Sequence, residues 1–150
     1  MMRPSPIRIL LADDDEDDRI IFADAMQQAK PNTQLTTVKN GVELIEYLEE
    51  HDGEEMPHLL FLDLNMPLKN GLDCLKEIRA HPRWKDLSVA IYSTSSSEED
   101  IENTFVQGAN VYIKKPNEFN RLVKVLSEVI KINWQYHTSG LNKDNFVMRI

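Results

Sequence analysis

The sequence predicts an α/β fold in which a mostly parallel β-sheet is covered by helices on both faces. Five short apolar runs alternate along the chain with five segments of helical periodicity. Runs that are apolar nearly throughout are typical of strands buried on both faces of a parallel sheet. Strict strand–helix alternation implies right-handed crossovers between neighbouring parallel strands. The 150 residues amount to about one domain.

The five predicted strands are short and rich in aliphatic or β-branched residues. They cover residues 7–12, 34–38, 59–62, 87–92 and 111–113. Apolar residues at helical spacing follow each strand, and the predicted helices contain residues 20–26, 42–48, 72–78, 98–107 and 117–132. Pro31, Pro82 and Gly108 end three of these helices.

Composition and charge exclude several classes of function. The formal net charge of −8 argues against a basic surface for nucleic acid or for an anionic membrane. No apolar stretch reaches the length needed to span a bilayer. The single cysteine, Cys74, rules out an internal disulfide. We therefore expect a cytoplasmic protein that contacts neither nucleic acid nor membrane.

Polar side chains stand where the predicted strands end. Asp13 and Asp14 follow the first strand, Asp63 the third, Ser93 the fourth and Lys115 the fifth. In open parallel sheets, ligands bind outside the carboxyl ends of the strands. The sequence therefore predicts a functional site at this edge.

The residue types at this edge favour phosphoryl transfer. The carboxylates of Asp13, Asp14 and Asp63 would repel one another, and Mg²⁺ relieves such repulsion because it prefers oxygen ligands. A carboxylate can also act as a nucleophile and form an acyl phosphate. Asp63 is the best candidate, because it directly follows a strand that we expect to be buried and central. Lys115 and Ser93 could then contact phosphoryl oxygens.

Each of these features also has a purely structural interpretation. Acids that follow a strand are often helix caps, and this applies to Asp15 and also to Asp13 and Asp14 taken alone. A lysine before a proline is usually exposed, and Ser97 suits the N-cap of the fourth helix. The ordered set on several strand ends is much less expected by chance than any one member.

The chain resembles the response-regulator receiver domain of two-component signalling. The segments that carry the resemblance are ILLADDD, FLDLNMPLKNG, YSTSSSEEDI and GANVYIKKP. The resemblance implies a flavodoxin-like (βα)5 fold with a five-stranded parallel sheet in the order 2-1-3-4-5. It divides the chain into a receiver domain, residues 1–133, and a C-terminal tail, residues 134–150.

The resemblance also implies a role for each residue at the sheet edge. Asp63 matches the phospho-acceptor. Asp13 and Asp14, together with Asp63 and the backbone carbonyl of Asn65, match the ligands of Mg²⁺, for which Mn²⁺ or Ca²⁺ can substitute. Ser93 matches the hydroxyl of the conformational switch.

Two further matches lie on the fifth strand and just after it. Tyr112 matches the aromatic switch residue, which turns from an exposed to a buried position, and Lys115 matches the lysine that contacts the phosphoryl group. The resemblance implies a cis peptide bond before Pro116. Lys114 stands where an apolar residue is usual, and we expect it to be exposed.

The implied function is that of a stand-alone switch in a bacterial phosphorelay, and not of an enzyme beyond self-catalysed phosphotransfer and dephosphorylation. The phosphoryl donor would be a histidine kinase or a phosphotransfer protein. The signal would pass to a downstream protein through the surface of the fourth helix, fifth strand and fifth helix. A homodimer through that surface or through the tail stays open.

The tail is too short for an output domain, yet it contains apolar residues. They are Trp134, Tyr136, Phe146, Val147, Met148 and Ile150. The tail could extend the last helix and end in an arm that binds a partner or a second copy, or it could pack on its own domain.

Two other functions are compatible with such a fold. The first is a pseudo-receiver that binds proteins without being phosphorylated, against which the complete acidic set and Lys115 argue. The second is a flavodoxin-like enzyme, such as a flavoprotein or a phosphatase. A flavoprotein would need a Ser-, Thr- and Gly-rich loop after the first strand, where this chain is acidic.

Overall fold

The computed structural model describes residues 5–53, 55–136 and 146–147. Five strands and five helices alternate within them, as predicted. In chain order they are β1 (Ile7–Ala12), α1 (Glu16–Ala29), β2 (Thr33–Val38), α2 (Gly41–Glu50), β3 (Leu59–Leu62), α3 (Gly71–Ala80), β4 (Ser88–Ser93), α4 (Glu98–Val106), β5 (Val111–Lys114) and α5 (Phe119–Tyr136). The strand ends differ from the predicted ones by one residue at most.

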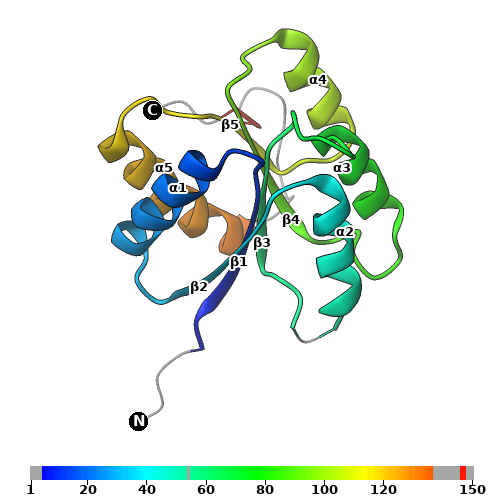
Figure 1. The fold of residues 1–150 in the computed structure, drawn as a ribbon, viewed down its shortest axis with the longest axis horizontal. Coiled ribbons are helices and arrows are strands. Elements are labelled where there is room, and N and C mark those ends of the chain that lie inside the picture. The colour runs from blue at the N-terminus through cyan, green and yellow to red at the C-terminus, as the bar shows by residue number, and fades with distance from the viewer. Residues whose placement is uncertain (1–4, 54, 137–145, 148–150) are drawn as a thin grey trace.

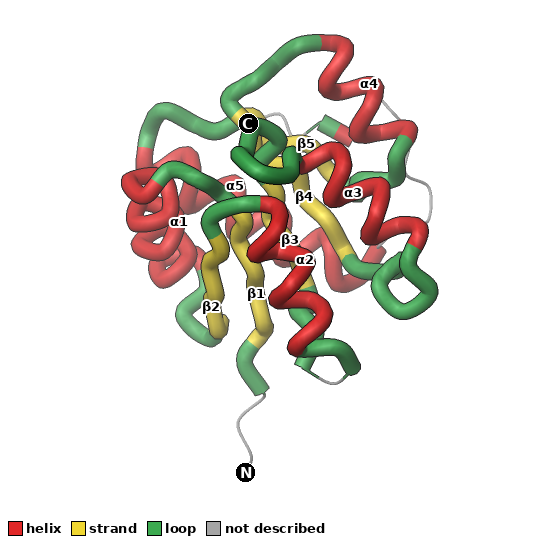
Figure 2. Tube along the Cα trace, turned by 45° about the vertical axis from the view of Figure 1, so that its right-hand side comes forward, coloured by secondary structure: helices red, strands yellow, loops and turns green. Residues whose placement is uncertain are grey.

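All five strands are parallel and lie in the order β2-β1-β3-β4-β5. Helices α1 and α5 cover one face of the sheet, and α2, α3 and α4 cover the other (Figure 1). Figure 2 shows the same three layers from a second direction. The predicted flavodoxin-like architecture is therefore confirmed. No helix among the described residues is both long and apolar enough to cross a membrane.

The central strands supply the core on both sides of the sheet. All four residues of β3 are fully buried. Leu60 and Leu62 pack toward α2 and α3, whereas Leu59 and Phe61 pack toward α1 and α5. Successive side chains of a strand point to opposite faces, so a strand covered on both sides must be apolar throughout. This burial makes β3 a rigid support for the residue that follows it.

Side-chain caps set the start of four helices. Asp15, Asn40, Asn70 and Ser97 each accept a hydrogen bond from the backbone N–H three residues later. Such caps stabilise a helix by about 1 kcal/mol each. The capping roles predicted for Asp15 and Ser97 are thus present. The caps hold the loops that lead from the strand ends into the helices.

The peptide bond between Lys115 and Pro116 is trans, so the predicted cis bond is wrong. A proline lowers the preference for the trans form to about 0.5–1 kcal/mol, but trans is still favoured. The backbone N–H of Lys115 donates to the carbonyl of Ser93 at 2.8 Å, which continues the pairing of β4 and β5 up to the proline.

Candidate functional site

The register of the sheet brings Asp13 and Asp63 together. Ala12 lies opposite Leu62 in the pairing of β1 with β3, so the next residue of each strand stands at the same edge. The N–H of Asp63 donates to the carbonyl of Ala12 at 3.0 Å. Both carboxylates are buried: Asp13 is fully buried, and Asp63 is 6% exposed. The edge thus holds two carboxylates in a largely dry environment.

Lys115 reaches this edge from the end of β5 and neutralises part of the charge. Its Nζ lies 2.8 Å from Oδ2 of Asp13 and 3.3 Å from Oδ2 of Asp63. A third carboxylate, that of Asp18 on α1, lies 2.9 Å from the same nitrogen. The ammonium group also stands 5.2 Å from the centre of the Tyr92 ring. The ammonium group of Lys115 therefore connects the ends of β1 and β3 with helix α1.

Burial and the neighbouring charges together set the pKa of Asp63. Burial raises the pKa of its carboxyl group, Lys115 lowers the pKa, and Asp13 raises it; the result is a pKa of about 6. Burial alone would lower the pKa of Lys115, but its contacts with Asp13 and Asp18 raise that pKa above the usual value. A carboxylate held out of water beside a fixed cation is a typical arrangement of functional sites.

The carboxylates of Asp13, Asp14 and Asp63 fit a divalent metal ion. One oxygen of each lies within 4.8 Å of the others. Adjacent ligands of octahedral Mg²⁺ stand about 2.9 Å apart and opposite ones about 4.2 Å, so the three carboxylates would have to move closer together to bind one ion. Oδ2 of Asp13 is buried, and its close neighbour is the ammonium group of Lys115 at 2.8 Å. A metal ion bound to this oxygen would therefore compete with Lys115 for it.

Two neighbouring residues shape the loop after Asp63. The N–H of Asn65 donates to Oδ1 of Asp63 at 3.4 Å, and the side chain of Asn65 is exposed. At the start of α3, a Cβ added to Gly71 would stand 2.1 Å from the carbonyl oxygen of Asp63. Only glycine allows this close approach. Gly71, which the sequence did not single out as a site residue, therefore supports the position of Asp63.

Ser93 and Tyr112 are connected through the loop between β4 and α4. Ser93 is fully buried, and its Oγ accepts a hydrogen bond from the N–H of Ser95 at 3.1 Å. The hydroxyl of Tyr112 donates to the carbonyl of Ser95 at 2.8 Å. The ring of Tyr112 is buried, so it occupies the inward of the two positions named above. The described residues contain no hydrogen bond between Ser93 and Asp63.

Asp18 is a member of the cluster that sequence reasoning missed. It lies in the first turn of α1, where acids usually complement the helix dipole, and this role gave no reason to single it out. Asp14 lies before the N-cap of α1, so helical spacing gives no signal that links it to Asp18. The contact between Asp18 and Lys115 depends on how α1 is oriented above the sheet.

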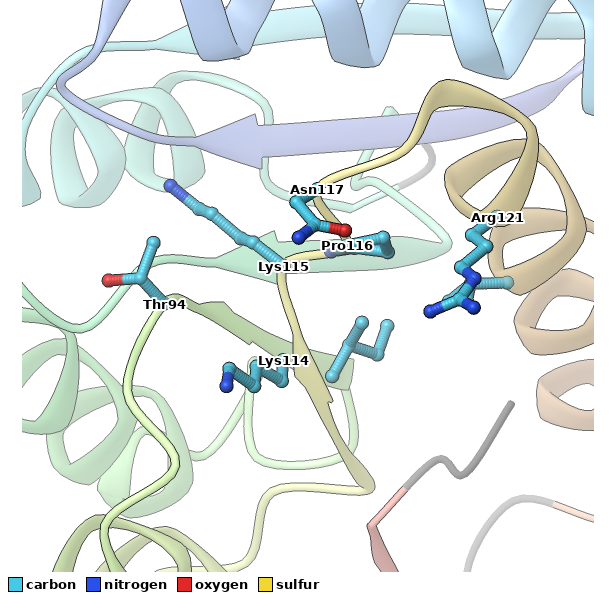
Figure 3. Close-up of a pocket in the computed structure, with 8 residues that line it drawn as sticks. Thr94, Lys114, Lys115, Pro116, Asn117 and Arg121 are labelled. Carbon is cyan, nitrogen blue, oxygen red and sulfur yellow. The ribbon is translucent and has the colours of Figure 1, made fainter.

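A groove lies at the end of β5, and Lys115 is one of the residues that line it. It has a volume of about 480 Å³ and is lined by Thr94, Ile113, Lys114, Lys115, Pro116, Asn117, Arg121 and Val125. Figure 3 shows that Lys114 and Lys115 leave the end of β5 in different directions. Lys114 is exposed, as expected. The lining contains three cationic residues and no carboxylate.

Comparisons with known proteins agree with this arrangement. The chain is 27% identical to the response regulator Rcp1 of a Synechocystis species over 127 residues, which are 83% of this chain and 86% of Rcp1. The crystal structure of the phosphorylated cyanobacterial phytochrome response regulator RcpA has a TM-score of 0.78 and 28% identity, and the match covers 91% of this chain and 99% of RcpA.

The structure of the Mn²⁺-bound form of Rcp1 has a TM-score of 0.74 and 26% identity, again over 91% of this chain and 99% of that chain. A protein-family model described as the response regulator receiver domain matches residues 9–127. This range contains the whole cluster at the sheet edge, from Asp13 to Lys115. The chain therefore belongs to the family of response regulator receiver domains.

Proposed function

We propose that this receiver domain is a phospho-acceptor switch in which Asp63 takes a phosphoryl group from a phosphohistidine. The observation that carries the proposal is the position of Lys115, whose Nζ stands 2.8 Å from Asp13 and 3.3 Å from Asp63. A cation at that point can follow an incoming phosphoryl group on Asp63 without a large movement. The donor would be a histidine kinase or a phosphotransfer protein, both acting in the cytoplasm.

In the proposed reaction, a carboxylate oxygen of Asp63 attacks the phosphorus atom as the P–N bond of the donor breaks. The departing imidazole keeps the bonding electron pair and takes up a proton. Lys115 offers a positive charge to the phosphoryl oxygens. Burial of Asp63 favours the transfer, because a desolvated carboxylate is a stronger nucleophile than a hydrated one.

Asp13, Asp14, Asp63 and the backbone carbonyl of Asn65 would hold a divalent cation, and Mg²⁺ is the proposed one. Such an ion, when bound, neutralises charge on the transferring phosphoryl oxygens. The Mn²⁺-bound form of Rcp1 supports a divalent site in this family. Mn²⁺ and Ca²⁺ are the expected substitutes. Water that reaches the acyl phosphate past Asn65 would hydrolyse it without an external enzyme.

The signal would leave the site through Ser93 and Tyr112. We propose that Ser93 turns its hydroxyl from the N–H of Ser95 to the phosphoryl group, and that Tyr112 then fills the space this movement leaves. Before phosphorylation the outward position of Tyr112 would be more populated than afterwards. Phosphorylation would act as a population shift between these two arrangements.

The proposed target binds the surface formed by α4, β5 and α5. The groove beside β5 presents Lys114 and Arg121 on a chain whose net charge is −8. Arg121 has only a loose pair with Glu118 at 3.8 Å, and both side chains are exposed. Charge complementarity therefore favours an acidic segment of the target. The proposal also covers a homodimer that forms through the same surface. It divides the chain into a receiver domain, residues 1–133, and a tail, residues 134–150.

The test is incubation with phosphoramidate and Mg²⁺ followed by intact-mass measurement. The wild-type chain should gain the mass of one phosphoryl group, and Asp63→Asn should gain none. Asp24→Asn, which changes an acid of α1 that no described contact joins to the cluster, is the matched control and should behave as wild type. A mass gain that survives Asp63→Asn would refute the assignment of the acceptor.

The rival pseudo-receiver would show no mass gain at any Mg²⁺ concentration. Two observations oppose it, namely the buried pair of Asp13 and Asp63 and the ion pairs of Lys115. A flavodoxin-like enzyme is opposed by the acidic loop after β1, which would repel a flavin phosphate. An absorbance spectrum and a phosphatase assay of the purified chain separate these options.

A further inference from the structure

Two residues near the C-terminus pack beside β5, outside the residues that match the family. Phe146 is fully buried. Its ring lies 5.3 Å from the ring of Phe105 and 6.1 Å from that of Tyr112, with interplanar angles of 64° and 63°. Val147 forms a parallel β-bridge with Tyr112. Figure 1 shows this short red segment beside β5.

The place where the segment lies is suited to receive it. β5 is the last strand in the sheet order, so one of its edges has no partner among the five strands. Such an edge presents backbone groups that can pair with an added strand. The side chains of Ile101 and Phe105 on α4 supply an apolar slot next to that edge. Burial of a Phe side chain is worth about 1.5–3 kcal/mol.

The contact reaches the phosphorylation site through Tyr112. Phe146 packs against the ring of Tyr112, whose hydroxyl is bound to the carbonyl of Ser95. The N–H of Ser95 in turn donates to Oγ of Ser93. Ser93 is the last residue of β4, at the strand end beside the cluster. Outward rotation of Tyr112 would break its contact with Phe146. Docking of the segment and burial of Tyr112 therefore favour each other.

We propose that Phe146 and Val147 form an intrachain ligand of the edge between α4 and β5, and that its docking is coupled to the occupancy of Asp63. The coupling rests on the proposed function, in which a phosphoryl group favours the buried position of Tyr112. Because linkage is reciprocal, docking of the segment strengthens binding at Asp63 by the factor by which a phosphoryl group strengthens docking. A partner that uses the same edge must displace the segment.

The test measures beryllofluoride binding to the full chain with Mg²⁺ by calorimetry. Phe146→Ala should weaken binding by about fivefold or more, the lower end of typical couplings between sites. Phe146→Leu, which keeps an apolar side chain, should restore most of the affinity. Val106→Ala is the matched control, because this α4 neighbour of Phe105 is 65% exposed and should leave the affinity unchanged. Equal affinities of Phe146→Ala and wild type would overturn the coupling.

Phe105→Ala and the double variant with Phe146→Ala complete a cycle. If the two rings act as one contact, the double variant should bind beryllofluoride as weakly as either single variant. Full additivity of the two effects would contradict this contact.

Docking itself has a readout that does not depend on phosphorylation. Amide hydrogen exchange in residues 111–114 should be faster in Phe146→Ala than in wild type, and the difference should not change on dilution. No difference would overturn the docking, and a difference that disappears on dilution would overturn its intrachain nature. If wild type failed to bind beryllofluoride while the exchange difference persisted, the proposed function and the coupling would fall, but the docking surface would stand.

Discussion

Asp63 allows a quantitative test of how the domain holds a buried carboxylate. Burial is the largest effect on this group, and it raises the pKa from the ordinary 3.8 to about 6 in the folded protein. The folded state therefore binds the proton of Asp63 more strongly than the unfolded state does. The contribution of this group to stability is complete below about pH 4 and is lost as the pH rises through about 6.

The loss between these pH values corresponds to about 3 kcal/mol, at 1.36 kcal/mol for each pH unit. Replacing Asp63 by Asn removes the charge that causes it. The pKa of about 6 already includes the attraction of Lys115, but the amide does not reproduce every contact of the protonated carboxyl group, so only part of this gain is expected. We therefore expect Asp63→Asn, measured in EDTA at pH 7, to have a free energy of unfolding about 1–2 kcal/mol above that of wild type.

The assay is urea denaturation of both proteins between pH 4 and pH 7.5. The two curves should approach each other toward pH 4, because wild-type Asp63 is then protonated in the fold. Asp24→Asn serves as the control and should stay within about 0.5 kcal/mol of wild type throughout. A variant that is less stable than wild type at pH 7 would refute the claim that burial dominates.

Mg²⁺ should reverse the order of stability. A ligand at a hundredfold excess over its Kd stabilises the folded state by about 2.7 kcal/mol. Asp63→Asn retains Asp13 and Asp14 but loses one charged ligand, so it should gain less from the metal. If Mg²⁺ stabilised both proteins equally, Asp63 would not belong to the metal site.

Three other predictions concern Lys115, Gly71 and the buried cysteine. Lys115→Ala should lower the free energy of unfolding by about 3 kcal/mol in urea denaturation, because it leaves buried carboxylates without their cation, and by less when Asp63→Asn is also present. Gly71→Ala should cost more than about 2 kcal/mol and slow phosphorylation by phosphoramidate, since its Cβ would meet the Asp63 carbonyl; wild-type behaviour would contradict that close approach. Burial raises the pKa of Cys74 to about 12, so a thiol reagent should modify native protein only as fast as it opens, and immediate complete reaction would refute this.

The sequence predicted most of the fold and the central part of the cluster for one physical reason. The chain direction of parallel strands brings their carboxyl ends to one edge, so residues that follow different strands become neighbours without any contact being known. Asp13 and Asp63 meet in this way through the pairing of Ala12 with Leu62. The fully apolar sequence of β3 further indicated which strand lies at the centre.

Other features depend on geometry that periodicity does not contain. The contact of Asp18 with Lys115 depends on how α1 is oriented above the sheet, and an acid in a first helical turn has an ordinary role as well. The resemblance implied a cis bond before Pro116, but the bond is trans, and the sequence by itself permits both isomers. Phe146 was identified as apolar, but its position beside Tyr112 is a long-range contact. Met148, Ile150 and the side chains of Trp134 and Tyr136 lie outside the described part of the chain.

The charges at the sheet edge imply an order of events. Among the described residues, the carboxylates of Asp13, Asp14, Asp18 and Asp63 outnumber the cationic side chains in contact with the edge, which are those of Lys115 and Arg19. The guanidinium of Arg19 is bound to the backbone carbonyl of Asp13 at 2.8 Å. An edge with this excess of negative charge attracts a metal ion and repels a phosphoryl group. The repulsion falls once a divalent cation is bound, so we expect the proposed phosphorylation of Asp63 to depend on prior occupation of the proposed metal site. Lys115 alone cannot replace that ion, because its charge is already shared among three carboxylates.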